Sequence, residues 1–212
     1  MSHSVKCLIS AGPTREWIDS VRYISNPSTG KMGYALASSA KSKKFEVTLV
    51  SGPVGIEPPA GVKFFSVESA IQMHDVLLRE MIDADLIIMS AAVSDHRPEY
   101  LGAEKVKKND FPSQLKLIRN PDILSEIGKT KRSNQTVVGF AAETSNLLEN
   151  ARKKLISKNL DWVVINDVSK KGRGFGTDTN EVTLLSKSNK CHTIPFGSKM
   201  EVATGILNKV WN

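Results

Sequence analysis

The sequence has few of the residues that build disulfide frameworks, zinc sites or membrane spans. Its 212 residues include two cysteines, Cys7 and Cys191, outside any CxxC pair, so we expect two buried or half-buried thiols. The four histidines are scattered, and no zinc-ligand spacing can be assembled from them. No apolar run approaches the ~20 residues that span a bilayer, so we expect no association with a membrane.

A secretory leader is also missing. The opening MSHSVK leads directly into the strand-like CLISA, without the apolar core of a signal peptide. We therefore expect a cytoplasmic protein. The hydrophobic content of 40% is ordinary for a globular chain, and the length suits a single α/β domain over residues 1–212.

Aromatic residues are sparse, at 6%, although the chain carries a formal net charge of +7. That charge fits three alternatives: a nucleic-acid partner, a highly phosphorylated substrate, or a solvated basic surface. Proteins that stack single-stranded bases interleave aromatic and basic side chains, and this sequence does not. We therefore expect no nucleic-acid partner, and a basic RNA-binding adaptor stays as the non-enzymatic alternative.

Two common nucleotide-binding fingerprints are absent. GPTRE at residues 12–16 stands where GxGxxG would follow the first strand, and no Tyr-x-x-x-Lys pair occurs. This disfavours a NAD(P)-binding reductase or epimerase, which remains an alternative. Gly30 and Lys31 resemble the end of a P-loop, but Met32 replaces its Ser/Thr and no glycine precedes at the required spacing.

The most informative stretch that is present covers residues 23–40, YISNPSTGKMGYALASSA. It places a polar, glycine-bearing loop directly before an alanine-rich helical run. Unpaired backbone N–H groups and the helix dipole make such a junction suitable for a phosphate or carboxylate. We predict a short anion-binding turn at Ser28, Thr29 and Gly30. A glycine turn with a purely steric purpose is the alternative.

Strands and helices alternate through most of the chain. Strands are expected at residues 5–11, 46–51, 62–67, 85–92, 136–141 and 161–165, with an antiparallel pair at 181–186 and 192–195; helices are expected at 30–41, 69–81, 120–128, 145–158 and 198–211. This pattern predicts a three-layer, Rossmann-like α/β fold with a mostly parallel central sheet and a C-terminal antiparallel hairpin. Turns at Gly12 and at residues 25–30, 91–95, 141–143 and 166–167 would then converge at the carboxyl ends of the strands, where ligands bind.

A long polar stretch at residues 94–114 interrupts this alternation, and loops of that length are usually lids, binding loops or disordered. Within it, EKVKK at 104–108 is a candidate basic flap, with Lys105 and Lys107 on one side to neutralise a polyphosphate. Lys154 and Lys158, four residues apart on one helix face, could reach a triphosphate. The alternative for each is an exposed basic surface. Asp95 and Asp122 could each contact a metal ion or a ribose. The alternative is that they only stabilise a turn and the start of a helix.

Nine motifs occur in an order that resembles a known family. They are GPTRE (12–16), RYISN (22–26), GKMG (30–33), VTLVSGP (47–53), AAVSD (91–95), EKVKK (104–108), NPDI (120–123), GFAAET (139–144) and NDVS (166–169). Together they closely resemble phosphopantothenoylcysteine synthetase, the phosphopantothenate–cysteine ligase of coenzyme A biosynthesis. The resemblance runs from Val5 to the final helix. It implies a stand-alone form without the flavin decarboxylase domain to which this ligase is often fused.

The resemblance implies a reaction in which 4′-phosphopantothenate and L-cysteine are joined while CTP is cleaved to CMP and pyrophosphate, through an acyl-cytidylate. Asn26 and Lys105 would be catalytic, Asn26 at the activated carbonyl and Lys105 at the triphosphate. The nucleotide would contact Met89, Ser90, Ala91, Asp95, Lys105, Pro121, Asp122, Ile123, Leu124, Phe140, Lys154 and Lys158. The phosphate and substrate site would comprise Asn26, Ser28, Thr29, Gly30 and Ala92.

The resemblance also implies cofactors and partners. Mg²⁺ would bridge the phosphates, held largely through the substrate and not by a dedicated protein site. A homodimer is expected, with the later hairpin contributing to the contact between subunits, and a separate flavin-dependent decarboxylase would act on the product. The KVKK and NPDI motifs favour CTP, and the same ligase using ATP remains an alternative.

Overall fold

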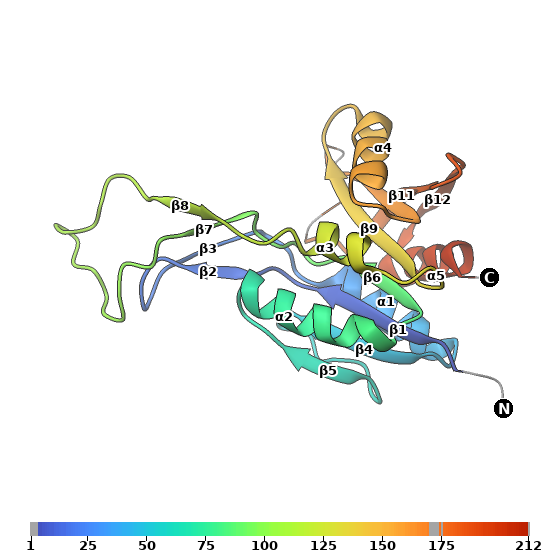
Figure 1. Ribbon diagram of the computed structural model, residues 1–212, viewed down its shortest axis with the longest axis horizontal. Coiled ribbons are helices and arrows are strands. Elements are labelled where there is room, and N and C mark those ends of the chain that lie inside the picture. The colour runs from blue at the N-terminus through green and yellow to red at the C-terminus, as the bar shows by residue number, and fades with distance from the viewer. Residues whose placement is uncertain (1–3, 170–173, 175, 212) are drawn as a thin grey trace.

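The protein is described by a computed structural model covering residues 4–169, 174 and 176–211, so the glycine-rich segment before the last hairpin lies partly outside the described residues. Its centre is an eight-stranded sheet in the order β12-β11-β10-β9-β6-β1-β4-β5 (Figure 1). The strands are β1 (Lys6–Ala11), β4 (Glu46–Ser51), β5 (Lys63–Ser66), β6 (Leu86–Met89), β9 (Thr136–Glu143), β10 (Trp162–Asp167), β11 (Thr179–Ser186) and β12 (Cys191–Ser198). The run from β5 to β10 is parallel, and β11 and β12 add an antiparallel hairpin, which confirms the predicted fold class.

Helices cover both faces of the sheet and produce two cores. One core packs α1 (Lys31–Ser42) and α5 (Lys199–Val210) against one face. The other packs α2 (Ala70–Glu80), α3 (Ile123–Thr130) and α4 (Leu147–Ser157) against the opposite face. A short 3-10 helix, η1 (Met81–Asp83), follows α2. Successive strand residues point to opposite faces, so a strand covered on both sides must be apolar throughout, as the fully buried LIIM of β6 is.

The strand expected at residues 85–92 ends earlier, at Met89. The reason is a pair of side-chain hydrogen bonds between the ends of neighbouring strands. The Ser90 hydroxyl donates to the Ser10 carbonyl at 2.6 Å, and the Ala91 N–H donates to the Ser10 hydroxyl at 3.2 Å. These bonds interrupt the backbone ladder, which resumes at an isolated parallel bridge between Pro13 and Ala92. The residues after Met89 are therefore held rigidly although they are not in a strand.

The third helix begins two residues later than expected. Asp122, not Asn120, is its N-cap, and the Asp122 carboxylate accepts the Ser125 N–H at 3.0 Å. The Asn120 side chain is used in tertiary contacts instead, because its Nδ2 donates to the Ser94 carbonyl at 2.9 Å and its Oδ1 accepts from Arg97 at 2.8 Å. The helix-start alternative for Asp122 is thus confirmed. In α4, Ala151 and Leu155 are buried and Leu148 is exposed.

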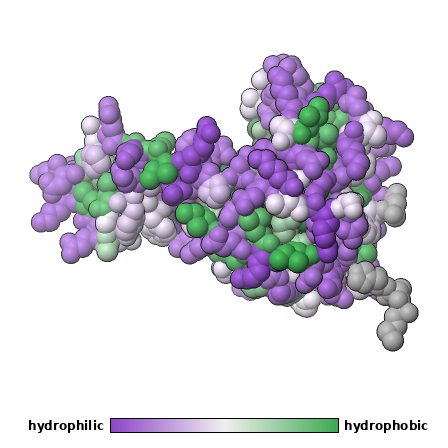
Figure 2. Space-filling view, in the orientation of Figure 1, coloured by the Kyte–Doolittle hydropathy of each residue, from purple (hydrophilic) through white to green (hydrophobic). Residues whose placement is uncertain are grey.

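The two polar connectors form paired hairpins that the sequence did not indicate. β2 (Arg15–Trp17) pairs with β3 (Tyr23–Ser25), and β7 (His96–Pro98) pairs with β8 (Leu117–Arg119). The two hairpins lie beside each other and project from the sheet as a long extension (Figure 1), which we call the arm, residues 15–25 and 96–119. Figure 2 shows hydrophobic residues among the hydrophilic ones along it. Exposed large apolar side chains on the arm are Val21, Tyr23, Ile24, Tyr100, Leu101 and Leu117.

Candidate functional site

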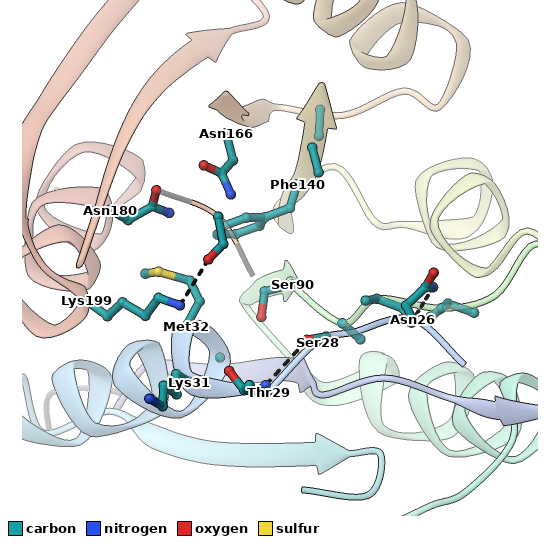
Figure 3. A pocket seen from close by; sticks show the side chains of 18 of the residues that line it. Asn26, Ser28, Thr29, Lys31, Met32, Ser90, Phe140, Asn166, Asn180 and Lys199 are labelled. Atoms are coloured by element: carbon teal, nitrogen blue, oxygen red, sulfur yellow. Dashed lines mark hydrogen bonds between the residues drawn. The ribbon is translucent and has the colours of Figure 1, made fainter. Parts of the chain in front are cut away.

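A cavity of about 380 Å³ opens at the carboxyl ends of the parallel strands (Figure 3). It collects the loop before α1, the segment after β6 and the carboxyl-terminal residues of β9 and β10, at the edge of the sheet where the sequence predicted a ligand site. Ten of the predicted site residues line it: Asn26, Ser28, Thr29, Gly30, Ser90, Ala91, Ala92, Asp95, Phe140 and Lys154. Their roles in catalysis or binding stay predictions.

The start of α1 is pressed against the strand ends by glycines. Gly30 is the N-cap and has a φ of 76°, a left-handed conformation that glycine adopts without strain. A Cβ on Gly33 would lie 2.5 Å from the Ala11 Cβ and 2.8 Å from the Ser90 hydroxyl oxygen. The first turn of α1 contains no acidic residue, so the positive end of its dipole faces the cavity without a carboxylate from the helix itself.

Two side chains shape the loop that precedes α1. The Asn26 Nδ2 donates to the Ala92 carbonyl at 3.1 Å, which ties the loop to the segment after β6. The Ser28 hydroxyl accepts the Gly30 N–H at 3.4 Å, a long hydrogen bond that bends the turn (Figure 3). Asn26 therefore has a fixed amide plane and retains a second Nδ2 hydrogen to donate to a ligand.

Lys154 brings a positive charge into the cavity from α4. Its Nζ donates to the Phe140 carbonyl at 2.6 Å. Burial lowers the pKa of Lys154, and the neighbouring ammonium of Lys158 lowers it further. Both causes disfavour the charged form of Lys154. An anion bound beside it would raise its pKa again, and by linkage the charged lysine would bind that anion more tightly.

The cavity also contains residues absent from the predicted site. Lys31 and Met32 belong to the GKMG motif and to the rejected P-loop but were given no role of their own. The turns at 141–143 and 166–167 were expected at this edge, also without an assigned role. Lys199 and Asn180 had no local signal in the sequence. Residues added by the structure are Lys31, Met32, Gly33, Val93, Ala141, Ala142, Asn166, Gly174, Asn180 and Lys199.

Asn166 carries an unsatisfied acceptor. Its Oδ1 is buried and has no hydrogen-bond partner among the residues that the structure describes. Leaving such a group unpaired costs about 1–3 kcal/mol, so native proteins rarely retain one without a reason. Asn166 lines the cavity, so this unpaired atom lies in its wall, although the atom itself has almost no accessible surface.

Six other predicted residues lie outside the cavity lining. Met89 is buried beneath it in β6, and Pro121, Asp122, Ile123 and Leu124 form the start of α3. Lys158 pairs with the Asp122 carboxylate at 3.0 Å. Partial burial raises the pKa of Asp122, but Lys158 and the Ser125 N–H outweigh it, and the net shift is downward. These residues continue the wall beside Lys154 and do not face the enclosed space.

Lys105 lies apart from the cavity. It is an exposed residue of the arm and lines a separate hollow with Arg22, Val106, Lys107, Lys108 and Phe111. The structure does not bring Lys105 and Asn26 into one cavity of the same chain. The neighbouring peptide of Lys105 is nevertheless fixed, because Val106 N–H donates to Asp19 at 3.2 Å and the Val106 carbonyl accepts from Arg22 at 2.9 Å.

The residues that the structure describes offer neither a metal-binding cluster nor a membrane-spanning helix. Within the described ranges, no group of three or more His, Cys, Asp and Glu side chains is placed to hold a metal ion. No helix in the same part of the chain is long and apolar enough to cross a membrane.

Comparison with known proteins identifies the family. A family model described as "DNA/pantothenate metabolism flavoprotein C-terminal domain" matches residues 2–212. The chain belongs to this family. It is 46% identical over 204 residues to the coenzyme A biosynthesis bifunctional protein CoaBC of Bacillus subtilis, covering 96% of this chain and 50% of that protein. The chain thus spans about half the length of the curated relatives it matches.

Solved structures agree with this assignment. The crystal structure of the C-terminal domain of a CoaBC protein has a TM-score of 0.83 at 40% identity, covering 97% of this chain and 93% of that one. A mutant of Cab2 in complex with phosphopantothenate-cysteine has a TM-score of 0.75 at 17% identity, covering 97% and 85%, and supports the fold alone.

Proposed function

We propose that this chain is the ligase that joins 4′-phosphopantothenate to L-cysteine, with CTP cleaved to CMP and pyrophosphate, in coenzyme A biosynthesis. The observation that carries the proposal is the basic cavity at the α1 N-terminus, with Asn26 anchored at 3.1 Å to Ala92. Membership of a family whose relatives include coenzyme A biosynthesis proteins supports it. Decarboxylation of the product is then left to a flavin-dependent decarboxylase.

The chemistry fits a site that binds and orients without a covalent nucleophile. A carboxylate oxygen attacks the α-phosphorus of CTP, and the bond from that phosphorus to the leaving oxygen breaks, which releases pyrophosphate. The cysteine amine then attacks the acyl carbon, loses a proton and displaces CMP. Both steps require neutralised phosphate charge and a held carbonyl. The α1 N-terminus and Lys154 supply positive potential, and the second Nδ2 hydrogen of Asn26 supplies a donor.

The nucleotide would occupy the side of the cavity formed by Phe140, Lys154 and Asp95. Phe140 offers apolar surface to a pyrimidine, and the side-chain amide of Asn166 belongs to the wall of the same cavity. Preference for CTP over ATP rests on the KVKK and NPDI motifs.

Magnesium would accompany the triphosphate. Mg²⁺ usually binds one or two carboxylates together with phosphate oxygens and several waters. Asp95 is the carboxylate at the cavity wall that fits this role, and no larger acidic cluster is needed. The ion would neutralise phosphate charge during the first step.

A homodimer would complete the site. Lys105 is separated from the cavity of its own chain, while the arm that carries it projects from the sheet and exposes several large apolar side chains. Exposed apolar surface of this kind marks interaction sites. We propose that the arm packs against a second copy and delivers Lys105 to the partner's cavity.

One assay tests the proposal. Purified chain is incubated with Mg²⁺, 4′-phosphopantothenate, L-cysteine and either CTP or ATP, and pyrophosphate and nucleoside monophosphate are quantified. We expect substrate-dependent release of both, faster with CTP. Absence of nucleotide cleavage with either nucleotide would overturn the ligase. A thermal shift with NAD(P)H would favour a reductase, and salt-sensitive RNA binding without pyrophosphate release would favour an adaptor.

A further inference from the structure

A buried lysine lies at the end of the cavity opposite Asn26. Lys199 is the first residue of α5, is 8% exposed, and lines the cavity (Figure 3). Its Nζ donates to the Gly174 carbonyl at 3.3 Å, a long bond for an ammonium group. Across the described residues, no carboxylate forms an ion pair with Lys199. A buried ammonium with no directly bonded carboxylate is costly, which indicates an anionic ligand.

Other positive groups surround Lys199. Lys31, the first residue of α1, lines the same end of the cavity and pairs with the exposed Asp178 carboxylate at 2.5 Å. Burial lowers the pKa of Lys199, the charge of Lys31 adds to that shift, and the Asp178 carboxylate opposes it without reversing it. Helix α1 begins here without an acidic residue in its first turn, so its positive end is available to an anion, whereas the first turn of α5 carries the Glu201 carboxylate. An anion at this position would interact with Lys199, Lys31 and the N-terminus of α1.

Asn180 adds a polar contact on the same side. It is 2% exposed, and its Oδ1 accepts the Glu181 N–H at 3.0 Å. This bond turns the Nδ2 end toward the cavity in Figure 3. The ligand expected beside Lys199, Lys31 and Asn180 is therefore an oxyanion with several acceptor oxygens, such as a polyphosphate.

The direction of the first chemical step identifies which anion this is. In phosphoryl-group and nucleotidyl transfer, the attacking and leaving oxygens lie roughly in line on opposite sides of the phosphorus. Under the proposed function, on which this argument rests, Asn26 marks the side of the attacking carboxylate. Figure 3 shows Asn26 and Lys199 at opposite ends, with Ser28 and Thr29 between them. The leaving group therefore departs toward Lys199.

We propose that Lys199, with Lys31 and Asn180, forms the subsite for the β- and γ-phosphates of the nucleoside triphosphate. As the bond from the α-phosphorus to the bridging oxygen breaks, its electron pair passes to that oxygen and the group leaves as pyrophosphate. The ammonium of Lys199 neutralises the charge that develops there. Monophosphate binding does not involve this subsite.

Direct binding tests the assignment without turnover. Isothermal titration of the intact chain with inorganic pyrophosphate, CTP and CMP is compared for the unaltered protein and Lys199→Gln. We expect pyrophosphate and CTP affinity to fall at least about tenfold, because a charged hydrogen bond is lost, while CMP affinity stays within about twofold. Lys209→Gln is the matched control, since Lys209 is exposed near the other end of α5.

Further variants protect the test from a folding defect. Lys199→Arg keeps the charge and should recover most of the pyrophosphate affinity, and Lys31→Gln should weaken pyrophosphate without altering helix α5. Unchanged pyrophosphate binding in both Lys199→Gln and Lys31→Gln, or an equal loss of CMP and CTP, overturns the subsite. If Lys199→Gln does not fold, unchanged binding in Lys31→Gln overturns it. Loss of pyrophosphate binding in a protein without ligase activity keeps the subsite and rejects the proposed reaction.

Discussion

Arg22 and Asp19 form an ion pair that holds the peptide next to Lys105. The Asp19 carboxylate is fully buried and accepts the Val106 N–H, while the Arg22 guanidinium donates to the Val106 carbonyl at 2.9 Å. The same guanidinium lies over the Phe111 ring, 3.9 Å from its centre. One pair of side chains thus connects the first hairpin of the arm to the segment that carries Lys105.

Replacement of Asp19 by Asn should loosen that segment. A neutral amide is a weaker acceptor than the carboxylate that binds both Arg22 and Val106. We therefore expect faster amide hydrogen exchange in the arm. Because Lys105 would be misplaced, nucleotide cleavage should fall on the order of 100-fold. The affinity of Asp19→Asn for CMP should equal that of the unaltered protein. Asp110→Asn, an exposed carboxylate of the same arm, is the control. Normal exchange in Asp19→Asn would contradict the bracing role.

The pH dependence of the arm follows from the same pair. The hydrogen bond from Arg22 holds the pKa of Asp19 well below its usual 3.8. A lowered folded-state pKa stabilises the arm above about pH 3.8, and this contribution is lost as the pH falls through the lower folded value. Hydrogen exchange of the arm should therefore accelerate in acid for the unaltered protein and show no such step in Asp19→Asn.

Mixing two inactive variants tests whether Lys105 acts across a dimer. Lys105→Gln should block acyl-cytidylate formation, whereas Asn26→Asp should let the intermediate accumulate. If Lys105 serves the partner's cavity, each mixed dimer contains one intact site, and random mixing should restore about a quarter of the activity. Each variant mixed with itself is the control. Failure to restore activity after subunit exchange would place Lys105 in its own chain's site.

Replacement of Asn166 by Leu should separate stability from function. Removing a buried acceptor without a partner should raise the free energy of unfolding by about 1 kcal/mol. The same change should weaken nucleotide binding, because a polar amide in the cavity wall is replaced by an apolar side chain. Urea unfolding and nucleotide titration measure the two effects. A destabilised variant with normal nucleotide affinity would show that Asn166 is structural.

Replacement of Gly33 by Ala should destabilise the start of α1. Alanine favours a helix by up to about 1 kcal/mol over glycine, but its Cβ would lie 2.5 Å from the Ala11 Cβ on a buried strand. Overpacking costs about 1–3 kcal/mol and should prevail. Gly205→Ala in α5 is the comparison, since its closest contact, at 2.8 Å, is a methyl of the Ile194 side chain, which can move. Equal effects would argue against a rigid contact at Gly33.

His74 should give the stability a pH-dependent component. Its Nε2 lies 2.9 Å from Glu126, which links α2 to α3. Burial lowers the pKa of His74, but hydrogen bonds to Asp75 and Glu126 outweigh it and raise the pKa above 6.5. This stabilisation is complete below about pH 6.5 and is lost as the pH rises through the folded-state pKa. Unfolding midpoints of His74→Gln, measured across that range, should lack this component, which is expected to be below about 1 kcal/mol.

Local sequence patterns determined the layers of this protein. The apolar runs at β1, β6 and β10 allow burial on both faces, and the capping boxes at Ser69 and Ser198 start helices where the pattern predicts. A parallel sheet with crossover helices follows, and its carboxyl edge brings Ser28 and Ala91 to one cavity. Periodicity and capping are local properties, so they can be read without the rest of the chain.

Tertiary structure alone decided which long-range partners meet. Asp19 and Arg22 both form hydrogen bonds with the distant Val106 peptide and so join the two halves of the arm, contacts that polar composition does not encode. Lys199 enters the cavity because α5 packs beside α1, so that both helices begin at one place. The separation of Lys105 from Asn26 has the same origin. The sequence shows which lysines carry a charge that could neutralise a phosphate. Only the packing of the helices and strands determines where their ammonium groups lie.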